Sequence, residues 1–238
     1  MTERRSPEAP DYAGHVPSSD RRAARRQEIL AATRRLFDER GVRDAQIEDI
    51  AQAVGINRAI IYRHFSGKEE LFAMALVDYL DELDAELGTA AGSSDDPSDR
   101  LVAIVHAFLD FGERHPAFVD CALALLRRRG DELMDEVSEA VMFRLGRAMT
   151  ACTAHVVNVL EDGTKQGVFD VPDPDLVANI FYTQALGVLN LATLRLSVRA
   201  LNPGHPRVDP VSFDEVKTYV AEAAKAMARG PVSRSGAR

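Results

Sequence analysis

The stretch "GINRAIIYRHFSGKEEL", residues 55–71, places a turn and two helix starts within seventeen residues. Gly55 is suited to end a helix, because glycine enters the left-handed backbone region without a steric penalty. Asn57 is a favoured N-cap for the helix that follows. Ser66 and Glu69 form an S-x-x-E capping box at the start of a further helix. The stretch therefore predicts a short helix held between two others.

The segments on either side of this stretch have the spacing of amphipathic helices. Upstream, a helix over about 21–40 ends at Gly41 and carries two apolar pairs at seven-residue spacing, Ile29/Leu36 and Leu30/Phe37. A second helix is expected over about 45–54, with Asp44 as its N-cap. The helix opened by the capping box continues to about Leu87.

Two helices joined by a short turn and braced by a third are the elements of a helix-turn-helix, whose second helix enters the major groove of DNA. The helix over 58–64 can be held down by Ile56, Ile61 and Phe65, packing against Leu30, Phe37, Ile47 and Ile50. Its other face then carries Arg58, Ala59, Ile60, Tyr62, Arg63 and His64. Arg58 can bind guanine with two hydrogen bonds, while Ala59 and Ile60 can touch thymine methyl groups.

Three further side chains suit the phosphate backbone. Tyr62, His64 and Lys68 can position the helix without reading sequence. Lys68 also lies in the first turn of a helix, whose free N–H groups favour an anion. The alternatives are that Tyr62 simply packs and that His64 is an ordinary surface histidine.

Net charge is distributed unevenly along the chain. The whole sequence carries −8, yet eleven basic and six acidic residues between Arg21 and Lys68 give that segment +5 and leave −13 on the remainder. A basic head on an acidic body is typical of a module that binds a polyanion. Charge alone would also fit a solvated helix face.

The remainder of the chain predicts a helical body. The linker "AGSSDDPSD", 91–99, contains a helix start at Asp96. Helices are expected over about 98–114, 116–128, 131–162, 174–200 and 212–228. No window alternates with period two over a convincing length, so we expect no sheet and an all-α fold. The expected domains are a flexible arm (1–19), a helix-turn-helix head (20–66), a body (67–229) and a flexible tail (230–238).

Two of these helices predict dimerisation. The helix over 212–228 has a narrow apolar stripe, typical of packing against one partner helix, made by Phe213, Val216, Val220, Ala223 and Met227. The helix over 174–200 is apolar around most of its circumference, which demands burial on two sides. One side can be its own body and the other a second subunit, so we expect a homodimer through residues 174–200 and 212–228.

The run "IEDIAQAVGINRAIIYRHFSGKEELF", 47–72, resembles the signature of the TetR family of bacterial transcription regulators, which has Ile-Ala, a turn Gly, Tyr-x-His-Phe, Lys-Glu and Leu. The match covers about residues 22–75. The resemblance implies a homodimer with N-terminal DNA-binding heads and a C-terminal ligand-binding and dimerisation body. It also implies base-proximal positions for Arg58, Ala59 and Ile60, and phosphate contacts for Tyr62, His64 and Lys68.

The chain departs from the usual family pattern at two places. The family often has Thr where this chain has Ala45 and Gln46, and again where it has Ile60. Gln46, Arg43 or the basic run 21–26 would then supply phosphate contacts in place of hydroxyl groups. The candidate DNA-binding residues are Arg43, Gln46, Asn57, Arg58, Ala59, Ile60, Tyr62, Arg63, His64 and Lys68.

The body offers no recognisable enzyme motif, since the sequence lacks G-x-S-x-G, H-E-x-x-H and a complete P-loop. We therefore expect no enzyme activity, no cofactor and no metal. His106 and Asp110, four residues apart, are a lone pair that falls short of a metal site. Cys121 and Cys152 are too few for a disulfide framework and suit core positions better than oxidant sensing.

A small-molecule cavity is a better prospect, because pockets form between the helices of bundles and are mostly apolar. Candidate wall residues are Phe108, Phe111, Phe118, Met142, Phe143, Met149, Phe181 and Tyr182. Candidate polar anchors are His106, Thr153, His155, Gln184 and Asn190. Each of them could instead belong to the ordinary core. The apolar content favours a small, lipophilic effector.

These features together predict a ligand-responsive repressor that binds a palindromic operator in double-stranded DNA as a homodimer and is released by its effector. One alternative is an architectural or activating DNA-binding protein without an effector. A helical enzyme is disfavoured by the lack of paired catalytic groups. The N-terminus has no apolar signal region, and polar residues interrupt the apolar segment 176–201, so we expect a cytoplasmic protein that does not enter the membrane.

Overall fold

The computed structural model describes residues 18–42, 44–127, 136–194, 196–202 and 205–230. The elements, in chain order, are α1 (Ser18–Arg40), α2 (Ile47–Val54), α3 (Arg58–His64), α4 (Lys68–Ala91), α5 (Pro97–Arg114), α6 (Pro116–Leu126), α8 (Glu139–Lys165), α9 (Pro174–Leu194), β1 (Leu196–Asn202), β2 (His205–Pro210) and α10 (Phe213–Ala228). The predicted all-α class is confirmed. Almost all of the predicted arm and tail lies outside the described residues.

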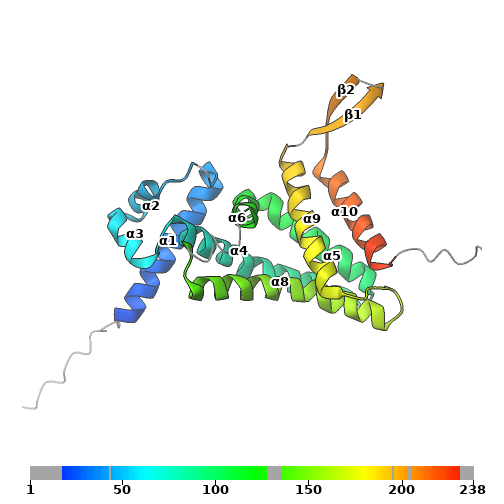
Figure 1. The fold of residues 1–238 in the computed structure, drawn as a ribbon, viewed down its shortest axis with the longest axis horizontal. Helices are drawn as coiled ribbons and strands as arrows, with labels where there is room; N and C mark the ends of the chain where they lie inside the picture. Colours follow the sequence, from blue (N-terminus) through cyan, green and yellow to red (C-terminus); the bar gives the residue numbers. More distant parts are fainter. Residues whose placement is uncertain (1–17, 43, 128–135, 195, 203–204, 231–238) are drawn as a thin grey trace, which may run out of the picture.

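Helix α4 joins the two parts of the molecule. Helices α1, α2 and α3 gather at one end, and α4 runs from them into the body, where it packs against α8, α5 and α6 (Figure 1). Side chains along its whole length are buried, from Leu71 through Tyr79 to Leu87. Because one apolar core continues from head to body, a movement of α4 must be felt at both ends. No helix within the described residues is both long and apolar enough to span a bilayer.

The helix starts in the head follow local capping chemistry. Asn57 caps α3 as expected, because its side chain accepts a hydrogen bond from the Ala59 N–H at 2.9 Å. Asp96 caps α5 in the same way. The prediction for α2 is wrong: Gln46 rather than Asp44 is the N-cap, and its N–H donates to an Asp49 carboxylate oxygen at 3.3 Å.

The predicted capping box of α4 is displaced by one residue. Gly67 is the N-cap, so Glu70 and not Glu69 stands three positions into the helix. The Glu70 carboxylate accepts from the Ser66 backbone N–H at 3.1 Å and from the Ser66 hydroxyl. The first residue of the helix determines which glutamate can accept the hydrogen bonds of the preceding residues. The S-x-x-E pattern placed that first residue one position too early.

The helix expected over 131–162 is interrupted. Residues 131–135 lie outside the described part of the chain, and the helical conformation is lost at Val137 and Ser138. Ser138 is extended, with φ −60° and ψ 146°, and is the N-cap of α8. Serine is more favourable at an N-cap than in a helix interior, so a break at this residue fits its intrinsic preference.

The expectation of no sheet is wrong. Helix α9 ends at Leu194, short of the predicted residue 200, and β1 pairs antiparallel with β2, with Val198 opposite Val208. Apolar and polar residues alternate over 196–200 and an Asn-Pro-Gly turn signal follows, which is a hairpin pattern. The hairpin projects beyond the neighbouring ends of α9 and α10 (Figure 1).

Candidate DNA interface and ligand pocket

Helix α3 has one face held in the core and one face free for a partner. Ile61 and Phe65 are almost fully buried, in the same apolar cluster as Ile47 and Ile50 of α2 and Leu30 of α1. Gly55, with φ 70°, makes the turn between α2 and α3. The helix therefore sits firmly against its neighbours in the head.

The opposite face of α3 carries most of the predicted contact residues. Arg58, Ala59, Tyr62 and Arg63 are exposed, whereas Ile60 and His64 are half-buried. Tyr62 leaves 48% of its surface exposed, which argues against a packing role. Ile60 offers less surface than its neighbours and is the weakest candidate for a base contact. The exposed face is basic and carries one aromatic side chain, which suits contacts with DNA bases and phosphates.

Arg58 forms an ion pair with Glu48 of α2, with 2.6 Å between the guanidinium Nη1 and the carboxylate Oε1. Both side chains are about three-fifths exposed, at 62% and 61%. Exposed pairs of this kind are worth about 0–1 kcal/mol. Arg58 can therefore leave Glu48 for a base edge at little cost.

Two arginines of α1 close the C-terminal end of α3. Arg26 donates to the His64 carbonyl at 2.7 Å and its guanidinium lies 4.5 Å from the centre of the Phe65 ring. Arg22 donates to the Arg63 carbonyl at 3.4 Å. Burial, followed by the positive charges of nearby arginines, lowers the pKa of His64. His64 therefore tends to be neutral in the free protein near pH 7.

The remaining predicted DNA-binding residues stand around this helix. Gln46 is exposed at the start of α2, and the side chain of Asn57 is engaged as the α3 cap. Lys68, half-buried at the start of α4, holds its ammonium 5.0 Å from the centre of the Phe72 ring. Arg43 lies outside the described residues.

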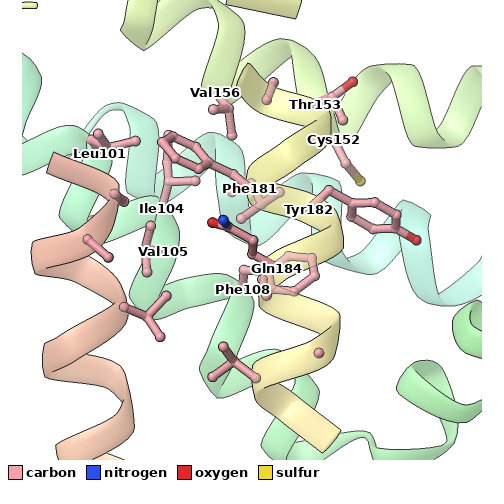
Figure 2. A pocket seen from close by; sticks show the side chains of 18 of the residues that line it. Leu101, Ile104, Val105, Phe108, Cys152, Thr153, Val156, Phe181, Tyr182 and Gln184 are labelled. Atoms are coloured by element: carbon pink, nitrogen blue, oxygen red, sulfur yellow. The ribbon is translucent and has the colours of Figure 1, made fainter. Parts of the chain in front are cut away.

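The body contains an apolar cavity of about 450 Å³ between α5, α8, α9 and α10 (Figure 2). None of the described residues that line it is charged. The Thr153 hydroxyl donates to the Met149 carbonyl at 3.1 Å, and the Cys152 thiol to the Leu80 carbonyl at 3.3 Å, so both already have partners. The Gln184 amide points from α9 toward the side of Val105 (Figure 2).

Some of the predicted pocket residues line this cavity and others do not. Phe108, Phe181, Tyr182, Gln184 and Thr153 line it. Burial raises the pKa of Tyr182 to about 12, so its hydroxyl stays protonated and can donate a hydrogen bond. The structure leaves the others outside the lining: His106, Phe111, Phe118, Met142, Phe143, Met149, His155 and Asn190.

Four of the residues outside the lining are instead packed in the core, exposed to solvent or paired with a charged group. Phe111 and Phe118 are fully buried against each other, with ring centres 5.3 Å apart. Phe143 is 70% exposed on α8. His155 pairs with Asp84, 2.8 Å away.

Residues of α5 and α10 complete the cavity wall and were missed by the sequence reasoning, among them Leu101, Ile104, Val105, Ala223 and Ala224. The apolar stripe of α10 was the signal that could have found them, because α10 packs on α5 of the same chain. Val220 of this stripe lies in the cavity wall.

The candidate metal pair His106 and Asp110 has a different role for its carboxylate. Asp110 forms an ion pair with Lys217 at 2.7 Å. No group of three potential metal ligands occurs among the described residues.

A cluster of side chains connects the cavity wall with the head. The Phe108 ring of the wall lies 5.9 Å from Phe118, which lies 6.2 Å from Tyr79 of α4. The Tyr79 hydroxyl donates to Asp38 of α1 at 2.8 Å, and the Arg34 guanidinium of α1 stacks 4.0 Å from the Tyr79 ring. Arg34 also pairs with Glu82 at 2.6 Å and lowers the pKa of that carboxyl. Packed side chains thus link the pocket to α1 without a gap.

Both cysteines lie in the interior. Burial raises the pKa of Cys121 and of Cys152 to about 12 in each case. Their thiols therefore remain protonated near pH 7, which makes them poor nucleophiles.

Comparison with known proteins identifies the head. The model of the family described as bacterial regulatory proteins, tetR family, matches residues 29–75. The transcriptional activator FasR of Mycolicibacterium smegmatis is 36% identical over 39% of this chain and 42% of its own length. The alignment therefore spans less than half of FasR.

A second relative matches most of the chain. The transcriptional repressor KstR2 of Mycobacterium tuberculosis is 28% identical over 77% of this chain and 84% of its own length. The solved structure of the KstR2 ketosteroid transcriptional regulator from that organism superimposes with a TM-score of 0.56 and 25% identity, covering 90% of this chain and 97% of the other. These relatives are transcription regulators rather than enzymes, and the head of this chain matches the TetR family of bacterial regulatory proteins over residues 29–75.

Proposed function

We propose that the chain is a ligand-responsive repressor that binds a palindromic operator as a homodimer and is released by a small, uncharged, mainly apolar effector. The observation that carries this proposal is the pairing of an exposed basic recognition helix with an apolar cavity in the body, joined by α4. In this scheme residues 20–66 form the DNA-binding domain and residues 67–229 the ligand-binding and dimerisation domain.

The recognition helix and the start of α4 supply the DNA contacts. Arg58 reads a guanine, Ala59 touches a thymine methyl group, and Tyr62, His64 and Lys68 hold phosphates. The stacked and hydrogen-bonded fit of α3 against α1 fixes the angle at which these side chains are presented. A protein that binds an operator on the bacterial chromosome acts in the cytoplasm, so a cytoplasmic location is part of this proposal.

The chemistry of the cavity limits the effector. A charged ligand would lose its hydration without gaining an ion pair, because no described lining residue is charged. Gln184 and Tyr182 can each hydrogen-bond a carbonyl or hydroxyl group of the ligand. A volume of about 450 Å³ accommodates a small-molecule ligand. The KstR2 relative is named as a ketosteroid regulator, and a flat apolar ketone meets the same requirements.

The outer surfaces of α9 and α10 suit a dimer. Large apolar side chains are exposed on both helices, namely Leu176 and Leu191 of α9 and Tyr219 of α10. Burying them against a second copy removes apolar surface from water. Val220 is partly buried against the core, whereas Tyr219 and Leu191, which also line the cavity, keep exposed surface that a second copy can cover.

Release follows from linkage between the two sites. An effector that prefers a body shape with more widely spaced heads weakens operator binding. By linkage, bound operator weakens effector binding by the same factor. Tyr79 and Phe118 connect the cavity wall with α1. The two heads must match half-sites about one DNA turn apart, so a modest shift in their spacing is sufficient.

Activation is the second candidate, because the FasR relative, which matches the head, is a transcriptional activator. A promoter fused to a reporter gene distinguishes the two: deletion of the regulator raises expression for a repressor and lowers it for an activator.

Selection of bound duplexes from a random DNA pool tests the DNA-binding part of the proposal. We expect a palindrome with two half-sites, and recovery of random sequences would support an architectural protein instead. The effector part is tested by thermal shift with a neutral steroid-like ketone and its carboxylate analogue. Only the ketone should raise the melting temperature, and the cavity-filling Val105→Phe should abolish that rise. Phe143→Ala, at an exposed position outside the cavity, is the matched control.

A further inference from the structure

We propose that the start of α1 and the end of α3 form a phosphate cradle, which grips the DNA backbone beside the groove that α3 enters. The cradle is a hollow lined by Arg21, Arg22, Arg25, Arg63 and His64. This inference rests on the proposed DNA-binding function and adds the start of α1 to the phosphate contact already proposed for His64.

The walls of the cradle are fixed to each other. Arg22 donates to the Arg63 carbonyl at 3.4 Å, and Arg26, which follows Arg25 in α1, donates to the His64 carbonyl at 2.7 Å. Arg26 also stacks on Phe65 and lies 3.8 Å from Glu70. Because these contacts join α1 to the end of α3, the cradle keeps a constant position relative to the recognition face.

The lining is almost entirely cationic. Four of its five side chains are guanidinium groups and the fifth is an imidazole. Arg25 pairs with Glu28 at 2.7 Å, but both side chains are exposed, so the carboxylate contributes little neutralisation. Like charges held this close repel one another, and an anion within the hollow relieves that repulsion. Arginine is also the side chain whose planar fork matches phosphate oxygens.

The position of the cradle favours contact with the phosphate backbone of DNA rather than with its bases. The hollow lies at the C-terminal end of α3, whereas base contacts come from Arg58 and Ala59 at its N-terminal end. The α1 residues of the cradle run from Arg21 to Arg25, a rise of about 6 Å along the helix. That length corresponds to about two base-pair steps of duplex at roughly 3.4 Å each. The cradle therefore reaches phosphates flanking the recognised bases and reads no sequence.

The test uses the full-length protein with Arg21→Ala and Arg25→Ala combined, and operator affinity measured over a range of salt concentrations. Arg35→Ala, exposed on the same helix outside the cradle, is the control for removing positive charge. We expect the double variant to bind operator and random duplex at least 10-fold more weakly at about 0.1 M salt. The salt slope should become shallower by about 0.9 for each phosphate that the variant no longer neutralises. The bases selected from a random pool should stay the same.

Two further measurements test whether the bound anion is a DNA phosphate and whether the variants remain folded. Shortening the operator at both ends by two base pairs should weaken the wild type but leave the double variant unchanged. Arg21→Lys with Arg25→Lys keeps the charge and should recover most of the affinity, provided that thermal unfolding matches the wild type.

The inference is overturned by a double variant that behaves like Arg35→Ala or changes the selected bases. It is also overturned if pyrophosphate raises the melting temperature through these arginines without competing with DNA. A wild-type protein that binds no duplex would instead refute the proposed function itself.

Discussion

The replacement Arg58→Ala removes the side chain that we propose reads one base in each half-site. In the free protein the guanidinium is paired with Glu48 at 2.6 Å, and both groups are about 60% exposed. Loss of such a pair changes the free energy of unfolding by about 0–1 kcal/mol. A bidentate arginine–guanine contact discriminates by about 1–3 kcal/mol, which is roughly 5- to 150-fold in affinity. The effect on recognition should therefore exceed the effect on stability.

The assay compares sequences selected from a random pool by the wild type and by Arg58→Ala, followed by fluorescence anisotropy on single-base variants of the operator. We expect preference to disappear at one position in each half-site and to persist elsewhere. Lys68→Ala is the contrasting variant, because removing a phosphate contact weakens all sequences alike and makes the salt slope shallower by about 0.9. Glu48→Gln removes both a competitor for Arg58 and a negative charge near DNA, so it should tighten operator binding.

Two results would refute this reasoning. One is an unchanged base preference for Arg58→Ala in a protein that melts like the wild type, which would mean that Arg58 does not read a base. The other is a uniform loss over all sequences, which would make Arg58 a phosphate contact like Lys68.

Three other changes test the remaining parts of the site. The pKa of His64 is lowered in the free protein and a bound phosphate would raise it, so operator affinity should increase as the pH falls from about 7.5 to about 6, and a titration of His64→Gln should show no such increase. Tyr219→Glu places a charge on the 77% exposed position of α10 and should yield monomers with poor operator affinity, whereas an unchanged dimer in sedimentation would contradict the proposed interface. Tyr79→Phe deletes the hydrogen bond to Asp38, worth about 0.5–1.5 kcal/mol, and should leave effector binding intact while reducing effector-induced release, measured as the ratio of operator affinities with and without effector. An unchanged ratio would exclude this contact from the coupling.

The head could be predicted from sequence because its structure is set by local chemistry. The turn at Gly55, the cap at Asn57 and the buried pair Ile61 and Phe65 each depend on residues within a few positions. The predictions that failed in the head did so by one or two residues, where neighbouring polar side chains competed for the same cap, as at Gln46.

The body was less predictable because its features depend on residues far apart in sequence. The aromatic residues Phe108, Phe111 and Phe118 look alike in the sequence, yet only Phe108 lines the cavity. Which face of a helix meets an open space depends on how α5, α8, α9 and α10 pack together. The hairpin was missed because its alternation covers only residues 196–200 and follows directly on an apolar helix.

The two interior thiols make the molecule convenient for labelling. With pKa values raised to about 12, Cys121 and Cys152 react slowly with maleimide dyes at neutral pH, so neither has to be replaced. A single Arg35→Cys substitution on the exposed side of α1 would then carry one dye in each subunit of a dimer. Energy transfer between the two dyes would report the spacing of the heads directly, with operator or with effector bound.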